Sequence, residues 1–330
     1  MALLKASLVL PPGVDAVPYT PTQPRMTAVP PEHVDDVRKL IYDLIQQGGS
    51  FEVIGNPNAP GLKDFYEFLQ SMDGGGFGAG ELEPIEAFQY EMSRNVADMS
   101  GRYMCSIVRD QDGKIASGAY GSVHAEQAPG TGGLFFMRFT ATEKTQRKTG
   151  VSKAADDLVF SQAEEWLHKR GQQLRYCGAE CVESSERYWN SYGMYRLYYW
   201  DQKKECLREL EYYLPHLGSW DQATGEPVDA LEQPQPEHYQ LFCGHNVISV
   251  EEFSAVLRRM WREWYVHREN FANPQAAEAH ERQVMDLLET RILTPLRGIS
   301  QLSLFSQEER ESYGKFGMRF ESEESPSGQN

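Results

Sequence analysis

Apolar residues recur at helical spacing in several stretches of the chain. From Val34 to Ile45, PPEHVDDVRKLIYDLIQQGG places them three or four positions apart, which predicts an amphipathic helix. GLKDFYEFLQSMD and PIEAFQYEMSRNVADMS predict two more helices, the second opened by Pro84. The same period runs from Val151 to Leu167, and it returns in two segments after residue 248. Ser249 and Glu252 form a capping box at the start of the first of these.

Short apolar runs between these helices predict β-strands. RYMCSIVRDQDGKIASGAY holds two runs around the hairpin turn Asp112-Gly113, and GGLFFMRFTAT predicts a third strand, from about Leu134 to Thr142. QLRYCGAECV predicts a strand, SSERYWNSYGM a short helix with a serine cap, and YRLYYWDQKKECLRELEYYL two strands joined at Lys203-Lys204. Helices, a hairpin, strand–helix–strand, a short helix and a closing hairpin predict an α/β fold.

Changes in composition divide the chain into four parts. Residues 1–33 form a proline-rich arm, because proline recurs every few positions between Pro11 and Pro31. Residues 34–214 hold the alternating helices and strands. Residues 215–320 begin with a polar, proline-bearing linker and continue as a helical C-terminal region, and residues 321–330 are predicted to be a disordered tail.

The charge balance restricts the partners. The chain of 330 residues has a formal net charge of -16, which argues against nucleic acid as a partner because phosphate binding needs a basic surface. No apolar run approaches the length of a membrane span, and the N-terminus is too weakly basic for a signal peptide, so we expect a cytoplasmic protein. The five scattered cysteines do not form a disulfide pattern, and no ligand spacing predicts a metal site.

Within this acidic chain, TQRKTGVSKAADDLVF places cations at the start of a predicted helix that follows a strand. The first N–H groups of a helix have no intrahelical partner, and the helix dipole favours an anion there. A glycine lets an anionic ligand approach the backbone closely. Arg147, Lys148 and Gly150, with the amides of Val151 and Ser152, therefore suit an anion site. The same residues also fit a solvated basic turn, and the local sequence leaves both interpretations open.

The block LFFMRFTATEKTQRKTGVSKAADDLVFSQAEEWLHKRG resembles the central strand, loop and helix of the GNAT superfamily of N-acetyltransferases. In that family an Arg or Gln, two residues, a Gly, one residue and a Gly or Ala wrap the diphosphate of acetyl-CoA. The loop here reads RKTGVS, with Ser152 in the last position. The flanking elements follow the family order over about residues 34–214. The resemblance implies a mixed, mostly antiparallel twisted sheet flanked by helices, with the helical C-terminal region as an addition.

The resemblance also implies an acyl-CoA-dependent N-acyltransferase, in which the acyl group, an acetyl in most members, passes directly from the CoA thioester to a primary amine. Thr142 is expected to bond the pantetheine arm through its backbone, and the strand that begins at Leu174 is expected to splay from the strand that begins at Leu134. The diphosphate is expected to contact the loop residues Arg147, Lys148, Thr149, Gly150, Val151 and Ser152.

The catalytic residues are less clearly indicated. An ungapped comparison places Trp189 where many family members have an acid tyrosine, and indole cannot act as an acid. Tyr188 is our candidate for the acid, with Tyr192 as an alternative, although both also fit simple packing in an aromatic helix. Glu180 is the best-placed base, and Glu143 is the second choice. No metal is required.

Three functions remain open from the sequence. The first is the N-acyltransferase, acting on a small-molecule or lysine amine. The second is an inactive GNAT-like module that senses CoA or binds a protein, and the third is a helical scaffold with an unrelated α/β domain. The aromatic cluster MWREWY in the C-terminal helices fits a cover for the acceptor site, a homodimer contact or plain helix packing.

Overall fold

The computed structural model describes residues 43, 47–71, 82, 84–97, 101–125, 132–181, 185–215, 220–228, 236–243, 245–266, 268–315 and 317–321. These residues form two compact units, one between residues 25 and 179 and the other between residues 180 and 330. We call them the N-unit and the C-unit. The boundary falls within a strand, whereas the sequence suggested a boundary after residue 214. The predicted helix from Val34 to Ile45 and the N-terminal arm lie outside the described residues, apart from Asp43.

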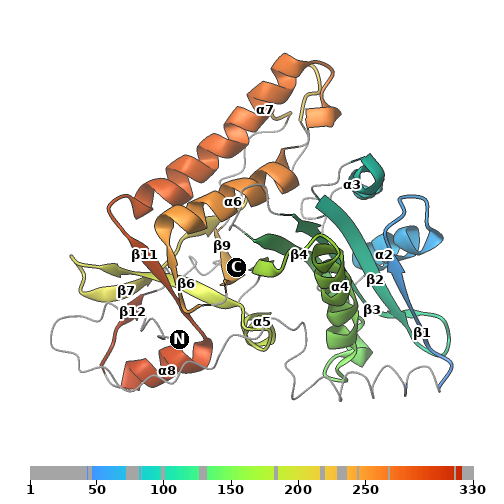
Figure 1. The fold of residues 1–330 in the computed structure, drawn as a ribbon, viewed down its shortest axis with the longest axis horizontal. Coiled ribbons are helices and arrows are strands. Elements are labelled where there is room, and N and C mark those ends of the chain that lie inside the picture. Colours follow the sequence, from blue (N-terminus) through green and yellow to red (C-terminus); the bar gives the residue numbers. More distant parts are fainter. Residues whose placement is uncertain are drawn as a thin grey trace, which may run out of the picture. The chain divides into compact units, whose positions relative to one another are not determined.

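The N-unit is built on a five-stranded sheet. Its strands follow the sheet order β1, β2, β3, β4 and β5, and all neighbours are antiparallel except β4 and β5, which run parallel (Figure 1). Their bounds are β1 Ser50–Ile54, β2 Gly101–Arg109, β3 Ile115–His124, β4 Gly133–Thr142 and β5 Leu174–Cys181. The predicted hairpin around Asp112-Gly113 joins β2 to β3, and a mixed, mostly antiparallel sheet is therefore confirmed.

Helices cover both faces of this sheet. Helix α4 (Val151–His168) lies on one face, where the hydroxyl of Ser106 on β2 donates to the carbonyl of Ala155 at 2.6 Å. Helices α2 (Pro60–Ser71) and α3 (Ile85–Ala97) lie on the other face. Cys105, the neighbour of Ser106, points into that second layer because side chains alternate along a strand. The predicted helices are thus confirmed, and each closes one hydrophobic layer.

The strands of the C-unit follow the sheet order β9, β6, β11 and β10. Strand β7 also pairs with β6, which confirms the hairpin predicted at Lys203-Lys204. Strand β12 runs parallel to β7, and β8 pairs with β9. The bounds are β6 Tyr195–Asp201, β7 Cys206–Glu209, β8 Tyr212–Tyr213, β9 Pro236–Phe242, β10 Val247–Ser249, β11 Gln301–Phe305 and β12 Phe320–Glu321.

Strands β9, β10 and β11 lie in a region for which the sequence predicted only a linker and helices. The reason is clearest in β9, whose sequence is PEHYQLF. A half-buried strand shows alternating polar and apolar residues, but in β9 both the apolar Tyr239 and the polar Gln240 are buried. His238, on the same side as Gln240, lies 2.9 Å from the carboxylate of Glu209. The expected pattern is therefore absent.

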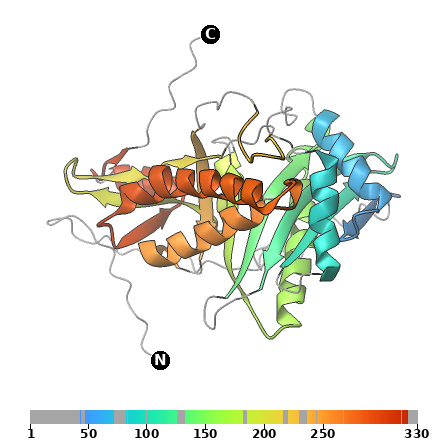
Figure 2. The same ribbon diagram turned by 90° about the horizontal axis from the view of Figure 1, so that it is seen from above.

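Helices also flank the sheet of the C-unit. Helix α6 (Val250–Tyr265) begins at Ser249, whose side chain accepts from the amide of Glu252 at 3.1 Å, so the predicted cap is confirmed. Helix α7 (Pro274–Leu287) packs beside it and continues as a π-helical turn over Leu288–Leu293 (Figure 2). The short helix α5 (Glu186–Asn190) has Ser185 at its N-cap, but this serine makes no side-chain capping bond. Helix α8 (Gln307–Lys315) contacts α5.

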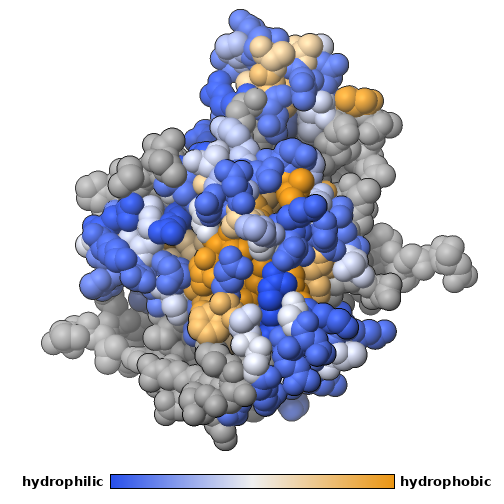
Figure 3. Space-filling model, turned by 90° about the vertical axis from the view of Figure 1, so that its right-hand side faces the viewer, coloured by the Kyte–Doolittle hydropathy of each residue, from blue (hydrophilic) through white to orange (hydrophobic). Residues whose placement is uncertain are grey.

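One edge of the N-unit sheet is apolar and exposed. Strand β1 ends the sheet order, and its Phe51 and Val53 are 45% and 37% exposed. Figure 3 shows the side of the molecule that faces right in Figure 1, where hydrophobic residues gather within a mostly hydrophilic surface. Elsewhere the large apolar side chains of this unit are mostly buried, as in the cluster that α2 and α3 form with β2 and β3.

Candidate functional site

The loop between β4 and α4 has an unusual backbone. After a 3-10 turn at Lys144–Gln146, Lys148 adopts φ 68° and Gly150 adopts φ 90°. Both values lie in the left-handed region, which glycine enters at little cost and a residue with a side chain enters rarely. Gly150 is the N-cap of α4, and its carbonyl accepts from the amide of Ala154 at 3.3 Å. The chain therefore turns sharply into the helix and leaves the loop backbone accessible.

Backbone donors converge at this turn. The amide of Val151 lies 3.4 Å from the hydroxyl of its neighbour Thr149, a long and weak bond. The amides of Gly150 and Ser152 have no acceptor among the residues that the structure describes. A helix N-terminus whose N–H groups face outward binds anions. The loop thus presents the donors that a phosphate needs.

The cations of the loop are also available to a ligand. Arg147 and Lys148 are exposed, and neither forms an ion pair with any carboxylate in the described part of the chain. The Nε atom of Arg147 lies 3.5 Å from the carbonyl of Thr142, at the limit of a hydrogen bond. Both side chains are therefore open to solvent in a chain with a net charge of -16.

The carboxylate of Glu143, the second candidate for the base, accepts hydrogen bonds within the turn. Its carboxylate accepts from the amide of Thr145 at 2.7 Å and also from the hydroxyl of Thr145. These bonds, chiefly that from the Thr145 hydroxyl, lower the pKa of Glu143. A carboxylate held in this way shapes the loop.

The pairing between strands β4 and β5 ends before strand β4 does. Their pairing runs from Gly133 with Leu174 to Met137 with Ala179, and within the described residues it extends no further. Strand β4 continues for five residues beyond Met137, to Thr142. Strand β5 runs only two residues beyond Ala179, to Cys181, so the splay expected between these strands stays a prediction. Thr142 pairs with Ser117 of β3, and their side-chain hydroxyls lie 3.0 Å apart.

A buried ion pair lies directly after Met137, the last residue of β4 that pairs with β5. The register between β3 and β4 shifts there, because Tyr120 pairs with Phe139 and Gly121 with Met137, so that Arg138 is the extra residue of a bulge. The guanidinium of Arg138 lies 2.6 Å from the carboxylate of Glu91 on α3, and both side chains are buried. The hydroxyl of Tyr120 donates to the other carboxylate oxygen. Helix α3 thereby fixes the side chain of the bulged residue.

Two acidic residues of α4 are buried in different ways. Asp156 is fully buried and accepts from the hydroxyl of Thr140 at 2.8 Å. Glu164, in contrast, is half-buried, and its burial together with the nearby charge of Asp157 raises its pKa to about 7. A carboxyl group with this pKa exchanges its proton near neutral pH.

Glu180 lies in the C-unit, one residue beyond the end of the β4–β5 pairing. The hydroxyl of Tyr265, the last residue of α6, lies 2.6 Å from each carboxylate oxygen, and the hydroxyl of Tyr212 on β8 donates to one of them. Behind Tyr212, the indole N–H of Trp261 donates to the tyrosine oxygen at 3.0 Å. Of these three aromatic residues, Trp261 and Tyr265 belong to the MWREWY cluster, for which a cover over the acceptor site was one alternative, whereas the sequence did not indicate Tyr212.

Tyr188, the candidate acid, lies on α5 in an aromatic cluster. Its ring contacts Trp189 and Tyr192 edge-on, and its hydroxyl is 3.5 Å from that of Tyr192. Trp189 is buried, as an indole that packs in the core would be. Helix α8 braces α5, because Arg310 forms an ion pair with Glu186 at 2.7 Å. The assignment of Tyr188 as the acid stays a prediction.

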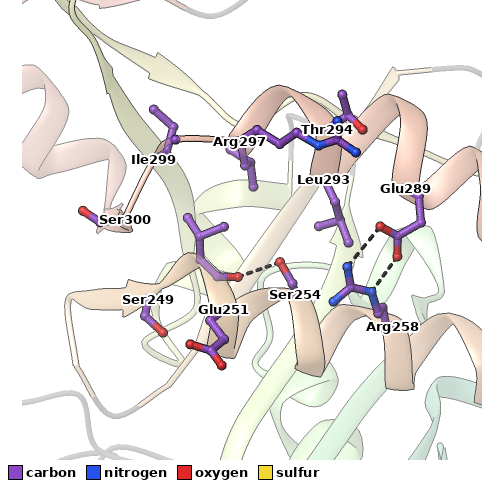
Figure 4. A pocket seen from close by; sticks show the side chains of 13 residues that line it. Ser249, Glu251, Ser254, Arg258, Glu289, Leu293, Thr294, Arg297, Ile299 and Ser300 are labelled. Atoms are coloured by element: carbon purple, nitrogen blue, oxygen red, sulfur yellow. Dashed lines mark hydrogen bonds and ion pairs between the residues drawn. The ribbon is translucent and has the colours of Figure 1, made fainter.

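A separate depression of about 550 Å³ lies at the opposite end of α6 from Tyr265. Figure 4 shows Arg258 of α6 and Glu289 of the π turn pointing toward each other across it, with a bond of 2.5 Å. Arg258 lowers the pKa of Glu289 through this bond. Glu251 and Arg297 line the same depression, so its two carboxylates and two guanidiniums balance, and the N-cap Ser249 already binds an amide of α6. This pocket is a poor match for an anionic ligand.

The described residues contain neither a metal-ligand cluster nor a membrane-spanning helix. No cluster of three or more His, Cys, Asp or Glu side chains in these ranges could hold a metal ion. No helix among them is both long and apolar enough to cross a bilayer.

Solved structures offer a comparison once this geometry is known. The chain resembles GNAT-family acetyltransferases. A GNAT-family acetyltransferase from Bacteroides thetaiotaomicron is 15% identical and matches 65% of this chain and 97% of its own, with a TM-score of 0.35. An Arabidopsis thaliana acetyltransferase solved with acetyl-CoA is 13% identical over 59% of this chain and 99% of its own, with a TM-score of 0.34.

A third similar structure is the ribosomal-protein-S18-alanine N-acetyltransferase from Escherichia coli, which is 12% identical over 59% of this chain and 93% of its own, with a TM-score of 0.33. No family model matches the sequence, and no curated protein sequence matches it significantly. The resemblance to GNAT proteins agrees with that found in the sequence, and it concerns the fold alone. The chemistry has to be derived from the residues of this chain.

Proposed function

We propose that this chain is an acyl-CoA-dependent N-acyltransferase that transfers an acyl group, in the simplest case acetyl, to a primary amine. The observation that carries the proposal is the exposed loop at the start of α4. There, the exposed cations Arg147 and Lys148 directly precede the first amides of the helix, and Gly150 provides the left-handed turn. A diphosphate fits this combination of charge and N–H donors. The end of the β4–β5 pairing supports a place for the thioester arm.

In this mechanism each residue has one task. The loop residues Arg147 to Ser152 bind the diphosphate, and the backbone of Thr142 orients the arm that carries the acyl group. The nitrogen of the neutral amine forms a bond to the acyl carbon as the bond from carbon to sulfur breaks, and Glu180 accepts the proton that this nitrogen loses. Tyr188 donates a proton to the departing sulfur. Solvent returns both side chains to their starting protonation.

Titration calorimetry with acetyl-CoA tests the binding step. Gly150→Glu adds bulk and negative charge at the turn, so we expect affinity to fall by at least about tenfold. Gly171 is the matched control, because it lies just beyond the other end of α4 with φ 70° and open space around it. Gly171→Glu introduces similar backbone strain and the same charge, and we expect normal binding. Equal binding by the wild type and Gly150→Glu would refute the proposed site.

A second candidate function rests on Trp189. If the acid position belongs to this buried indole, the protein binds CoA without catalysis. An assay for release of the free CoA thiol, with a panel of polyamines, aminoglycosides and lysine peptides, separates the two functions. Thiol release that depends on an amine supports the enzyme. Binding of acetyl-CoA without release in the presence of any amine supports the CoA-sensing module.

A further inference from the structure

The carboxylate of Glu180 is held by a chain of aromatic donors from the C-terminal region. Tyr265 contributes two contacts of 2.6 Å, and Tyr212 donates to the same group. Tyr265 and Tyr212 are both buried, so water competes little for these hydroxyls. Hydrogen bonds from hydroxyls to a carboxylate favour its ionised form and fix its orientation.

The chain of donors continues one step deeper. The indole N–H of Trp261 binds the oxygen of Tyr212, which directs the hydroxyl proton of Tyr212 toward Glu180. The ring of Tyr212 stacks on Tyr239 with ring centroids 5.0 Å apart, and Trp261 contacts Tyr265 edge-on. The titratable groups that act on Tyr212 in this cluster are Glu180 itself, Tyr239 on β9 and Tyr265 on α6.

We propose that Tyr265 and Tyr212 are positioning residues that hold the carboxylate of Glu180 ionised and aimed at the acceptor amine, so that helix α6 belongs to the catalytic apparatus. This inference rests on the proposed function, since it assigns a purpose to the orientation of Glu180. It also gives the C-terminal helices a role that neither a dimer contact nor plain core packing would require.

The matched control is Tyr213, the neighbour of Tyr212 on the same strand. Its hydroxyl donates to the carboxylate of Glu211 at 3.0 Å, so Tyr213→Phe removes a bond of the same kind outside the cluster. Tyr265→Phe is the main test variant, because it keeps the ring and leaves the bond from Trp261 to Tyr212 in place. Tyr212→Phe is the second, and it also leaves the buried N–H of Trp261 without its acceptor.

The first measurement is independent of activity. Glutamate is labelled with ¹³C at the carboxyl carbon, the Glu180 signal is identified by its absence in Glu180→Gln, and its titration is followed by NMR. We expect Tyr265→Phe to raise the pKa of Glu180 by about one unit, because one donor to the charged form is lost. Tyr213→Phe is expected to leave it unchanged. An unchanged pKa in both Tyr265→Phe and Tyr212→Phe would overturn the inference.

The second measurement uses the pH profile of kcat/KM with an active amine. We expect Tyr265→Phe to move the acidic limb to higher pH and to lower kcat about tenfold or more through loss of orientation. Its KM for acetyl-CoA should stay within about twofold of the wild-type value, because the loop at α4 is untouched. A wild type that binds CoA but acylates no amine would refute the proposed enzyme, while the NMR titration would still decide on the positioning of Glu180.

Discussion

Glu91 and Glu180 are both carboxylates that accept hydrogen bonds from tyrosine hydroxyls, but they lie in different surroundings. Glu91 is 1% exposed and pairs with the guanidinium of Arg138, with Tyr120 as a further donor. Glu180 is half-buried, and Tyr212 and Tyr265 donate to it. An ion pair enclosed away from solvent is suited to a structural role, because removing one partner of such a pair is strongly destabilising. Donation from hydroxyls orders a carboxylate and leaves it able to take up a proton.

The largest loss of stability is expected when the carboxylate of Glu91 is removed. Glu91→Ala removes the carboxylate that lies 2.6 Å from the buried guanidinium of Arg138 and that accepts from the hydroxyl of Tyr120, so the free energy of unfolding should fall by about 3–5 kcal/mol. Urea denaturation measures this. The double variant Glu91→Leu/Arg138→Met removes both charges and should recover most of the loss.

The corresponding substitution at Glu180 is expected to affect activity more than stability. Glu180→Ala should cost less stability, about 1–3 kcal/mol, mainly because the buried hydroxyl of Tyr212 loses its acceptor. We expect the opposite order for amine acylation, which Glu180→Ala should abolish. Equal losses of stability at the two sites would contradict the distinction between a structural and a functional carboxylate.

A third carboxylate, that of Glu164, is expected to make the stability of the protein depend on pH. Burial and Asp157 raise the pKa of Glu164 from 4.5 to about 7, so the folded state prefers its protonated form. Stability relative to the unfolded chain is therefore lost as the pH rises from about 4.5 to 7, and it stays lost above that. Glu164→Gln removes the titration and should be more stable than the wild type by about 1 kcal/mol above pH 7, after allowance for solvent screening.

Thermal unfolding at several pH values measures the effect of Glu164→Gln. At pH 4.5 the variant and the wild type should unfold at nearly the same temperature, because Glu164 is then protonated in the folded state. A constant difference across the whole range would mean that the glutamine acts through packing and not through charge.

The smallest effect is expected at an exposed ion pair. Arg109 lies 2.5 Å from the carboxylate of Asp64, and about half of the aspartate side chain is exposed to solvent. Asp64→Asn should change the free energy of unfolding by less than about 1 kcal/mol, because water and salt screen such pairs. Urea denaturation at low and high salt checks this. A loss as large as that of Glu91→Ala would show that distance, and not burial, decides the worth of an ion pair here.

The sequence predicted those features that depend on neighbouring residues. Gly150 marked the turn into α4 because a left-handed N-cap needs glycine, and the hairpin at Asp112-Gly113 followed from its turn residues. Glu180 was identified as a candidate from its place at a strand end. Its partners were not, because Tyr212 and Tyr265 lie 32 and 85 positions further along the chain. No local pattern reports contacts over such separations.

The misassignment of β9 has the same origin. Its polar residues His238 and Gln240 are paired or enclosed by strands that are distant in sequence, so a strand with two buried faces does not show the alternation of a half-buried one. Strand β11 likewise pairs with β6, about a hundred positions earlier. Elements of this kind become visible only after the rest of the sheet is in place.

The left-handed backbone at Lys148 has a consequence for efforts to make this protein more robust. A lysine with φ 68° stores strain that a glycine or an asparagine would relieve. A laboratory selection for heat resistance alone would therefore tend to discard this lysine. Under the proposed function this lysine binds the diphosphate, so a selection that also demanded turnover would keep it.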